Sequence, residues 1–542
     1  MTTNEALPGP SKGRTREWRY LAGILATSFL IRLPFLMSTG FFSDESVYTY
    51  SAYAVLRGSV PYEGIMLPHP PLGYLGIAAL VFVSSENLVL LRACYLVLFL
   101  IIGLLTYVFL ATLRDAGSSP FNPLGAVVML TVYPIPYSLT TPLEFILFEI
   151  PVLLSLVFAV KGIVTKSIWR LIISGALMAA ALMIWYPAVF VAIAVVTFAL
   201  IYFARKNSWR ESVKLTLPLI VGGLVATGMA LLLIALFGDL SNFVLQSISL
   251  QSSLRADFTL AERLRHVWIS VLEFLPMIIL GIVGAAEIIR RAVSRGDLLS
   301  LLPVYLYILN FTLISTVPRV VLSHYFAYLT PFLAYFASGP VETLFKRLFL
   351  VRIDVKAHIP SSLDFYKSII AVFMIVLVLF VPLYGVPRTT GFLSTNQYTV
   401  AEQSVAASIA KMTGPGDRIW TSEGAIAYFA SRLIVSPNSS KWPIQAMYND
   451  VFNATYIDAD GVNKTGLGIV SPSQFIQSWS HDRTKILVFI LGPGPIPYPD
   501  DFLWNGFGNT AGVRSWVETK YDLNATFVFP EVDYTYKVWV IK

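Results

Sequence analysis

Long, uninterrupted apolar runs constrain this chain more than any other feature. A helix that crosses a bilayer needs about 20 consecutive, mostly apolar residues, and such runs recur between residues 18 and 384. Only 13% of the 542 residues are charged, whereas ordinary soluble domains carry about 25%. We therefore expect a polytopic α-helical membrane protein.

The apolar runs predict eleven spans, and the charges between them predict an orientation. We place the spans at about 18–37, 88–112, 121–139, 145–161, 171–184, 187–204, 213–236, 267–289, 298–317, 322–338 and 368–384. Lys and Arg cluster in alternate connections, which the positive-inside rule assigns to the cytoplasm. The N-terminus is then inside and the C-terminus outside. The apolar segment Pro71 to Val83, at about 13 residues, is too short to cross, so we expect an interfacial or re-entrant helix there.

The composition changes near residue 384 and predicts three regions. These are a cytoplasmic tail at 1–17, a transmembrane domain at 18–384 with an external loop at 38–87, and an extracytoplasmic α/β domain at 385–542. In the last region, β-rich runs at 418–421, 486–490 and 534–541 alternate with helix-like stretches at 400–411 and 424–431, with Gly and Pro clusters between them.

Several smaller features agree with this organisation. The α/β region holds four Asn-x-Ser/Thr triplets, at Asn438, Asn453, Asn463 and Asn524, which fit a glycosylated external surface and an archaeal host. The triplet at Asn310 falls inside a span and is expected to be accidental. The only cysteine, Cys94, excludes disulfides within the chain. The net charge of +7 resides largely in short loops, so nucleic acid is not an expected partner.

Two adjacent acids, Asp44 and Glu45, follow the first span. Carboxylates at the edge of a bilayer are costly to keep ionised, which makes them functional candidates. The alternative is that Asp44 caps the helix that follows it, since Ser43 and Asp44 are both good N-cap residues. Capping explains one acid but not the tyrosines, glycine and prolines that accompany the pair.

The ordered set of residues around this pair resembles the first external loop of polyprenyl-phosphate-dependent membrane glycosyltransferases of the C superfamily. The most similar branch contains protein O-mannosyltransferases and bacterial aminoarabinose transferases. The matching positions are Arg32, Asp44, Glu45, Tyr48, Ala52, Leu56, Gly58, Pro61, Tyr62, Pro70, Pro71 and Leu72.

This resemblance implies roles for the acids. It implies that Asp44 is the base that takes the proton of the acceptor hydroxyl, with direct displacement and inversion at the anomeric carbon. Glu45 either orients Asp44, binds the acceptor or faces water. Glu144, at the outer start of a span, stands where relatives commonly carry an aspartate, and the alternative is that it complements a helix dipole. We expect all three acids in the catalytic site.

The leaving phosphate calls for external cations, and positive charge is otherwise depleted on that side. The candidates for substrate binding are Arg57, His69, Arg92, Arg255, Arg265, Arg319, His324 and Tyr325. The run from Pro318 to Tyr325, followed by Pro331, resembles a late span of the family near the donor phosphate. The alternative for any external arginine is contact with lipid head groups.

We therefore expect an enzyme that transfers a single sugar, with mannose as one candidate, from a dolichyl or polyprenyl phosphate to a hydroxyl of a protein, glycan or lipid outside the cell. No cofactor is expected. A divalent cation between the acids occurs in the oligosaccharyltransferase branch, but no clear third ligand is present here. The alternative function is a secondary transporter or a flippase for lipid-linked sugars. Against it, the spans show no internal repeat, and charges are sparse in mid-membrane, where coupling sites usually lie.

Overall fold

The computed structural model describes most of the chain. The described residues are 12–36, 44–62, 67, 69–131, 143–249, 259–318, 323–350, 396–421, 424–435, 472–481, 483–491, 512–529 and 534–542. Of the predicted elements, the span at 368–384 and the triplets at Asn438, Asn453 and Asn463 lie outside these residues.

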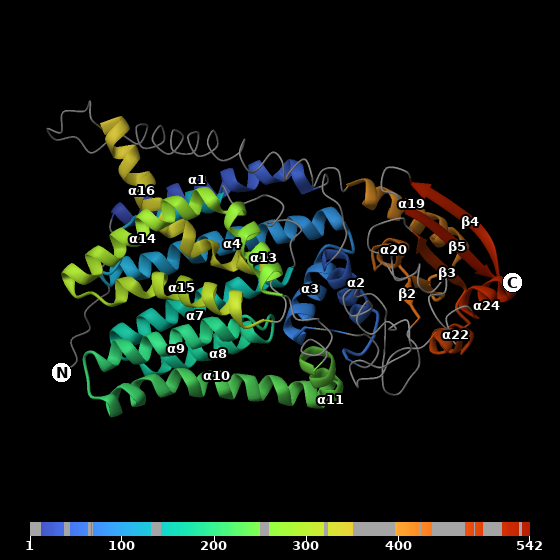
Figure 1. Cartoon of the computed structure of the whole chain (residues 1–542), viewed down its shortest axis with the longest axis horizontal. Coiled ribbons are helices and arrows are strands. Elements are labelled where there is room, and N and C mark those ends of the chain that lie inside the picture. The colour runs from blue at the N-terminus through green and yellow to red at the C-terminus, as the bar shows by residue number, and fades with distance from the viewer. Residues whose placement is uncertain are drawn as a thin grey trace.

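The N-terminal two thirds of the chain form a bundle of helices that lie roughly along one direction (Figure 1). A short pair of helices, α2 and α3, lies at the end of the bundle that faces the α/β domain. The helices are α1 (Lys12–Arg32), α2 (Asp44–Leu56), α3 (Pro71–Val83), α4 (Leu88–Asp115), α5 (Pro123–Thr131), α7 (Leu143–Thr165), α8 (Ile168–Leu182), α9 (Ala188–Ala204), α10 (Trp209–Phe237), α11 (Leu240–Phe243), α13 (Leu260–Glu273), α14 (Leu275–Arg295), α15 (Leu302–Thr316) and α16 (Thr330–Leu350).

Four helices of the described part are long and apolar enough to cross a membrane: α4, α7, α10 and α15 with the 3₁₀ turn before it. The chain is therefore a multi-pass membrane protein, as predicted. The helix Pro71–Val83 is confirmed with the predicted bounds. The break between 184 and 187 is also confirmed, since α8 ends at Leu182 and α9 begins at Ala188, directly after Pro187.

One predicted span is wrong as a single helix. The run 267–289 is divided between α13 and α14, which meet at an angle of 84°. Pro276 occupies the first turn of α14, and a proline there cannot continue the hydrogen-bond ladder of a preceding helix. Because the apolar pattern runs through this position, hydropathy alone did not reveal the break.

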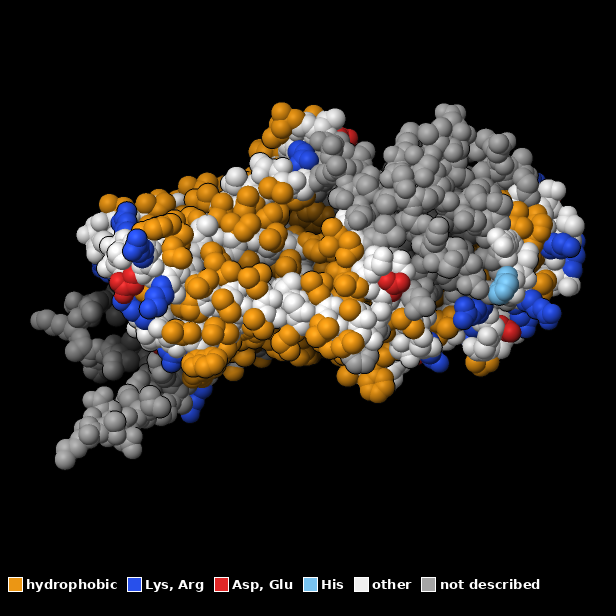
Figure 2. Space-filling view, turned by 90° about the horizontal axis from the view of Figure 1, so that it is seen from below, with side chains coloured by type: hydrophobic (Ala, Val, Ile, Leu, Met, Phe, Trp, Pro, Cys, Tyr) orange, Lys and Arg blue, Asp and Glu red, His pale blue; other side chains and the backbone are white. Residues whose placement is uncertain are grey.

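The outer surface of the bundle is apolar. On α10, the side chains of Leu224, Met229 and Leu236 are all more than half exposed. Figure 2 shows hydrophobic side chains over the flank of the bundle and a group of Lys and Arg at the end away from the α/β domain. An apolar surface of this extent is unfavourable in water and suited to lipid.

Helices α8 and α10 approach each other through glycines. A Cβ atom at Gly175 would lie 1.9 Å from the carbonyl oxygen of Leu219, and one at Gly222 would lie 2.1 Å from that of Ile172. Small residues permit close packing of membrane helices where no hydrophobic effect drives association. Across α7 and α8, the hydroxyls of Ser155 and Ser174 each donate to the other's carbonyl oxygen.

The C-terminal region is an α/β domain built on a five-stranded sheet in the order β2-β1-β3-β5-β4. Strands β2, β1 and β3 are parallel, and β5 and β4 extend the sheet antiparallel. Its elements are α19 (Asn396–Met412), β1 (Arg418–Thr421), α20 (Gly424–Ala430), β2 (Leu433–Ile434), α22 (Pro472–His481), β3 (Ile486–Leu491), α24 (Gly512–Lys520), β4 (Tyr521–Phe529) and β5 (Tyr534–Ile541). The buried rings of Trp420, Trp479 and Phe489 pack together in its core.

The strands predicted at 418–421, 486–490 and 534–541 are confirmed, as are the two helix-like stretches. Asn524 is exposed on β4, and its glycosylation stays a prediction. The side chain of Asn310 is fully buried in α15 and accepts a hydrogen bond from the hydroxyl of Tyr328 at 3.1 Å. Its triplet is therefore part of the packing, in agreement with the prediction.

Candidate functional site

The acid pair begins the short helix α2. Asp44 is the first residue of this helix, and its side chain is outside the described part of the structure. The side chain of Glu45 is only 1% exposed and forms an ion pair with Arg92 of α4, itself 1% exposed. Arg92 donates from Nε to one carboxylate oxygen at 3.0 Å and from Nη2 to the other at 2.8 Å.

The Glu45–Arg92 pair connects three segments. Arg92 also donates from Nη1 to the carbonyl oxygen of Leu36, at 3.2 Å, and Leu36 ends the 3₁₀ turn that follows α1. Burial raises the pKa of the Glu45 carboxyl, while the charge and hydrogen bonds of Arg92 lower it. A buried carboxylate with two charge-assisted hydrogen bonds is a strong geometric restraint, so the pair fixes the start of α2 against α4.

Arg32, which matches the family pattern, also has a structural position. It is fully buried at the end of α1, and its Nη1 donates to Ser28 Oγ at 2.9 Å and to the carbonyl oxygen of Thr131 at 3.2 Å. The guanidinium lies 4.5 Å from the centre of the Phe99 ring. These contacts join the end of α1 to the end of α5 and to the middle of α4.

Aromatic side chains pack around Tyr48, which follows the acid pair on α2. The ring of Tyr48 lies 5.6 Å from the imidazole of His69 and 5.7 Å from the ring of Tyr74 on α3. All three side chains are buried. The prediction that His69 binds substrate stays a prediction, and the structure places the residue in the packing between α2 and α3.

The loop between α2 and α3 is held by a distant π-helical turn, Val244–Ser249. Gln246 accepts from the backbone NH of Leu67 at 3.1 Å and donates to the carbonyl oxygen of Tyr62 at 2.8 Å. Ser247 donates to the carbonyl oxygens of Leu67 and His69, both at 3.1 Å. Both side chains are buried, so they fix the path of the loop.

The α/β domain packs on the other side of α2 through α20. The hydroxyl of Tyr50 accepts from the backbone NH of Ile434 at 2.7 Å. The hydroxyl of Tyr428 donates to the carbonyl oxygen of Glu86 at 2.8 Å, and its ring lies 5.9 Å from that of Tyr53. The helix that begins with the acid pair is therefore held between the bundle and the α/β domain.

The other predicted site residues are dispersed or not described. Arg57 is half exposed and pairs with Glu86 at 2.9 Å. Arg265 is exposed on α13, and the ring of Tyr325 lies 5.7 Å from that of Trp185. Glu144 and His324 belong to α7 and a 3₁₀ turn, with side chains outside the described part, as are Arg255 and Arg319 entirely. Among the described candidates, the structure pairs Glu45 with Arg92 and places the ring of His69 against Tyr48, which lies on the same helix as Glu45.

Among the described side chains, no group of three His, Cys, Asp or Glu could hold a metal ion. The carboxylates of Asp44 and Glu144 are outside that set. The expectation that the enzyme needs no metal therefore stays a prediction.

Sequence reasoning missed the partners that shape this site. It treated Glu45 and Arg92 as separate candidates, although they are 47 positions apart in the chain and form one pair. It also gave no role to Gln246 or Ser247, which lie between the spans predicted at 213–236 and 267–289. Covariation between positions 45 and 92 would be the signal to look for.

No protein-family model matches the sequence, and neither does any curated protein sequence. The structure, however, is similar to that of ArnT from Cupriavidus metallidurans bound to undecaprenyl phosphate, with a TM-score of 0.57 and 13% identity. That match covers 96% of this chain and 98% of ArnT. The oligosaccharyltransferase of Archaeoglobus fulgidus, tethered with an acceptor peptide, follows at a TM-score of 0.48 and 12% identity, covering 95% of this chain and 74% of that one. The similarity to ArnT shows that the chain shares the fold of that protein.

Proposed function

We propose that this protein is a membrane glycosyltransferase that moves a single sugar from a polyprenyl or dolichyl phosphate to an acceptor hydroxyl. The reaction would take place on the extracytoplasmic side, where the positive-inside pattern places Asp44. A protein, a glycan or a lipid could supply the hydroxyl, and mannose is one candidate sugar.

The observation that carries the proposal is the fold. Its similarity to ArnT extends over nearly all of both chains, including the helical bundle and the C-terminal domain. The ArnT structure contains undecaprenyl phosphate, which is the chemical class of donor proposed here. Because a fold can host several functions, the residues at the start of α2 must supply the chemical argument.

In the proposed reaction, the acceptor oxygen attacks the anomeric carbon of the donor. Asp44 takes the proton of the hydroxyl as the new carbon–oxygen bond forms. The bond between the anomeric carbon and the phosphate oxygen breaks, and the lipid phosphate leaves with that electron pair. Attack opposite the leaving group inverts the configuration of the sugar.

Glu45 and Arg92 would act as positioning residues. Their pair is buried, and the three guanidinium nitrogens of Arg92 already donate hydrogen bonds. Access of a phosphate to Arg92 would require this pair to open. We therefore assign the pair to orientation of α2, and through it of Asp44, while its predicted direct roles in catalysis and donor binding remain untested.

The proposal is tested by Asp44→Asn in the purified full-length protein, supplied with radiolabelled dolichyl-phosphate mannose and a mixture of protein, glycan and lipid acceptors. Removal of a general base lowers rates by about 10² to 10⁴-fold, and we expect a loss in that range. Asp522→Asn is the matched control, because Asp522 is exposed on β4 and should transfer at the normal rate. Undiminished transfer by Asp44→Asn would remove this residue from the mechanism.

The same assay in sealed vesicles separates transfer from transport. The enzyme discharges the donor and produces free dolichyl phosphate. A transporter would carry substrate across the bilayer and leave the sugar–phosphate bond intact.

A further inference from the structure

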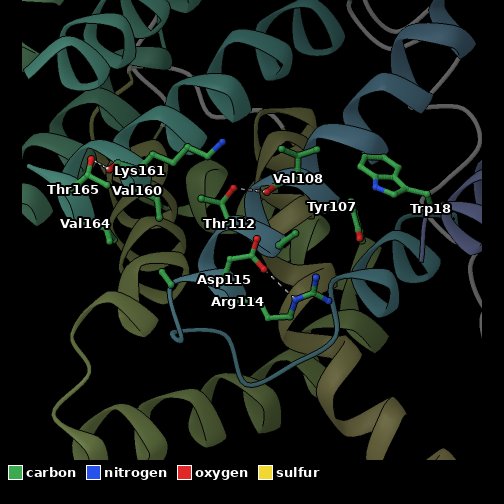
Figure 3. Close-up of a pocket in the computed structure, with 12 residues that line it drawn as sticks. Trp18, Tyr107, Val108, Thr112, Arg114, Asp115, Val160, Lys161, Val164 and Thr165 are labelled. Atoms are coloured by element: carbon green, nitrogen blue, oxygen red, sulfur yellow. Dashed lines mark hydrogen bonds and ion pairs between the residues drawn. The ribbon is translucent and has the colours of Figure 1, made fainter. Parts of the chain in front are cut away.

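A concave site lies at the opposite end of the bundle from the acid pair. It is a cavity of about 430 Å³ between α1, α4 and α7. Figure 3 shows Trp18 of α1 on one side, Lys161 and Thr165 of α7 on the other, and the last turns of α4 between them. Helix α4 packs against both α1 and α7, so it forms the floor of a groove between them.

Cations predominate in this groove. Arg114 is held in place by Glu17, to which its Nη1 and Nη2 donate at 2.8 and 3.0 Å, and Asp115 lies 3.8 Å from its Nε. Nη1 of Arg170 donates at 3.0 Å to Oγ1 of Thr165, which lines the groove. Lys161 is exposed and has no carboxylate within 4 Å in the described part of the chain. The lining of the groove thus carries two cations, Arg114 and Lys161, and one carboxylate, Asp115, and its lysine is available to an anion.

The groove also lies where lipid head groups are found. Its lining includes the final residues of α4 and α7, two of the helices that are long and apolar enough to cross the membrane. Trp18, which is 48% exposed, belongs to a residue type enriched at the membrane interface. Val108, Val160 and Val164 continue the lining with apolar surface, and Val164 is nearly half exposed.

We propose that this groove binds the phosphate of an anionic membrane phospholipid. Lys161 would pair with the phosphate, and the valines would contact the first part of the acyl chains. Basic pockets between membrane helices bind anionic head groups in this way. A soluble phosphate would use the same lysine, but it would leave the apolar part of the groove uncovered, so the lipid is the better complement.

The test uses the full-length protein in an uncharged detergent and native mass spectrometry to follow binding of dioleoyl phosphatidylglycerol. One lysine near a membrane surface contributes about fivefold in affinity, so we expect Lys161→Ala to weaken binding about fivefold. Lys206→Ala is the matched control, because Lys206 is exposed at the same end of the bundle, bonded to Tyr202, and outside the groove. The affinity of the Lys206→Ala variant for phosphatidylglycerol should equal that of the wild type.

Three further measurements identify the class of ligand and the position of its binding site. Phosphatidylcholine with the same chains should bind more weakly than phosphatidylglycerol, and glycerol 3-phosphate should bind more weakly than either lipid. Brominated phosphatidylglycerol should quench less fluorescence in Trp18→Phe than in the wild type. Equal weakening by Lys161→Ala and Lys206→Ala, no preference for the anionic lipid, equal affinity for glycerol 3-phosphate, or quenching unchanged by Trp18→Phe would each overturn the proposal.

Discussion

Each end of helix α4 carries an ion pair between an arginine and a glutamate, but the two pairs lie in different environments. At one end, Arg92 pairs with Glu45, and both side chains are 1% exposed. At the other end, Arg114 pairs with Glu17 at the same distance of 2.8 Å, but the side chains are 29% and 26% exposed. The chemistry is shared, and burial is what differs.

This difference predicts different consequences. A buried pair has lost its hydration, so removal of one partner leaves a charge that nothing compensates. A partly exposed pair exchanges its partner for water at little cost. The buried pair is thus suited to fixing the position of α2 and the acid that begins it, whereas the partly exposed pair can be disrupted at little cost.

The largest expected effect comes from breaking the buried pair on one side. Arg92→Met leaves Glu45 buried without its cation and should lower the free energy of unfolding by roughly 3–5 kcal/mol. Thermal unfolding of the purified protein in detergent measures this loss. Glu86→Gln is the control, because the pair of Glu86 with Arg57 is exposed. If Glu86→Gln lowered the free energy of unfolding as much as Arg92→Met does, burial would not explain the difference between the pairs.

Replacing both partners should restore much of that loss. In Glu45→Leu with Arg92→Met, no buried charge remains, and apolar replacements of buried pairs are often neutral or stabilising. We expect the double variant to unfold at a higher temperature than either single variant. Losses that simply add would show that the two residues act independently.

The matched substitution at the partly exposed end of α4 should lower the free energy of unfolding much less. Arg114→Gln should cost about 0.2–1 kcal/mol, and the cost should shrink in high salt because exposed charges are screened. The same unfolding measurement, in low and high salt, compares this variant with Arg92→Met. A cost at the exposed end equal to that at the buried end would contradict the comparison.

The smallest effect is expected at an exposed pair in the α/β domain. The hydrogen bond from Lys485, with a further one from the NH of Gly414, lowers the pKa of Asp417. A lowered pKa means that the contribution is present above the ordinary aspartate value near 4 and is lost as the pH falls through the lowered value. Asp417→Asn should therefore unfold at a slightly lower temperature than the wild type at pH 7. The difference in unfolding temperature should disappear at acidic pH. A difference that grows there would contradict a lowered pKa of Asp417.

Local patterns predicted much of this architecture. The apolar run at 71–83 predicted a helix with the observed bounds, and the spans placed at 171–184 and 187–204 predicted the break between α8 and α9. Strands such as Tyr534–Ile541 follow from β-rich runs bounded by turn residues. Each of these predictions depends on neighbours in the sequence.

The features that depend on distant contacts could not be predicted in this way. The match between Glu45 and Arg92, and the support that Gln246 gives to the loop at Leu67, join residues 47 and 179 positions apart. Hydropathy and residue type contain no information on such pairs. For the same reason, the resemblance of the first loop to a family indicated Asp44 but not the contacts that hold its helix.

The most direct test of the account is whether the protein discharges a lipid-phosphate sugar. Purified protein in liposomes would receive dolichyl-phosphate mannose, other polyprenyl-phosphate sugars and the mixed acceptors, and free lipid phosphate and labelled acceptor would be measured together. We predict that the two appear in equal amounts with at least one donor, and that the rates of both fall by about 10² to 10⁴-fold with Asp44→Asn. No discharge of any lipid-phosphate sugar by active, folded protein, or equal discharge by both proteins, would contradict the account.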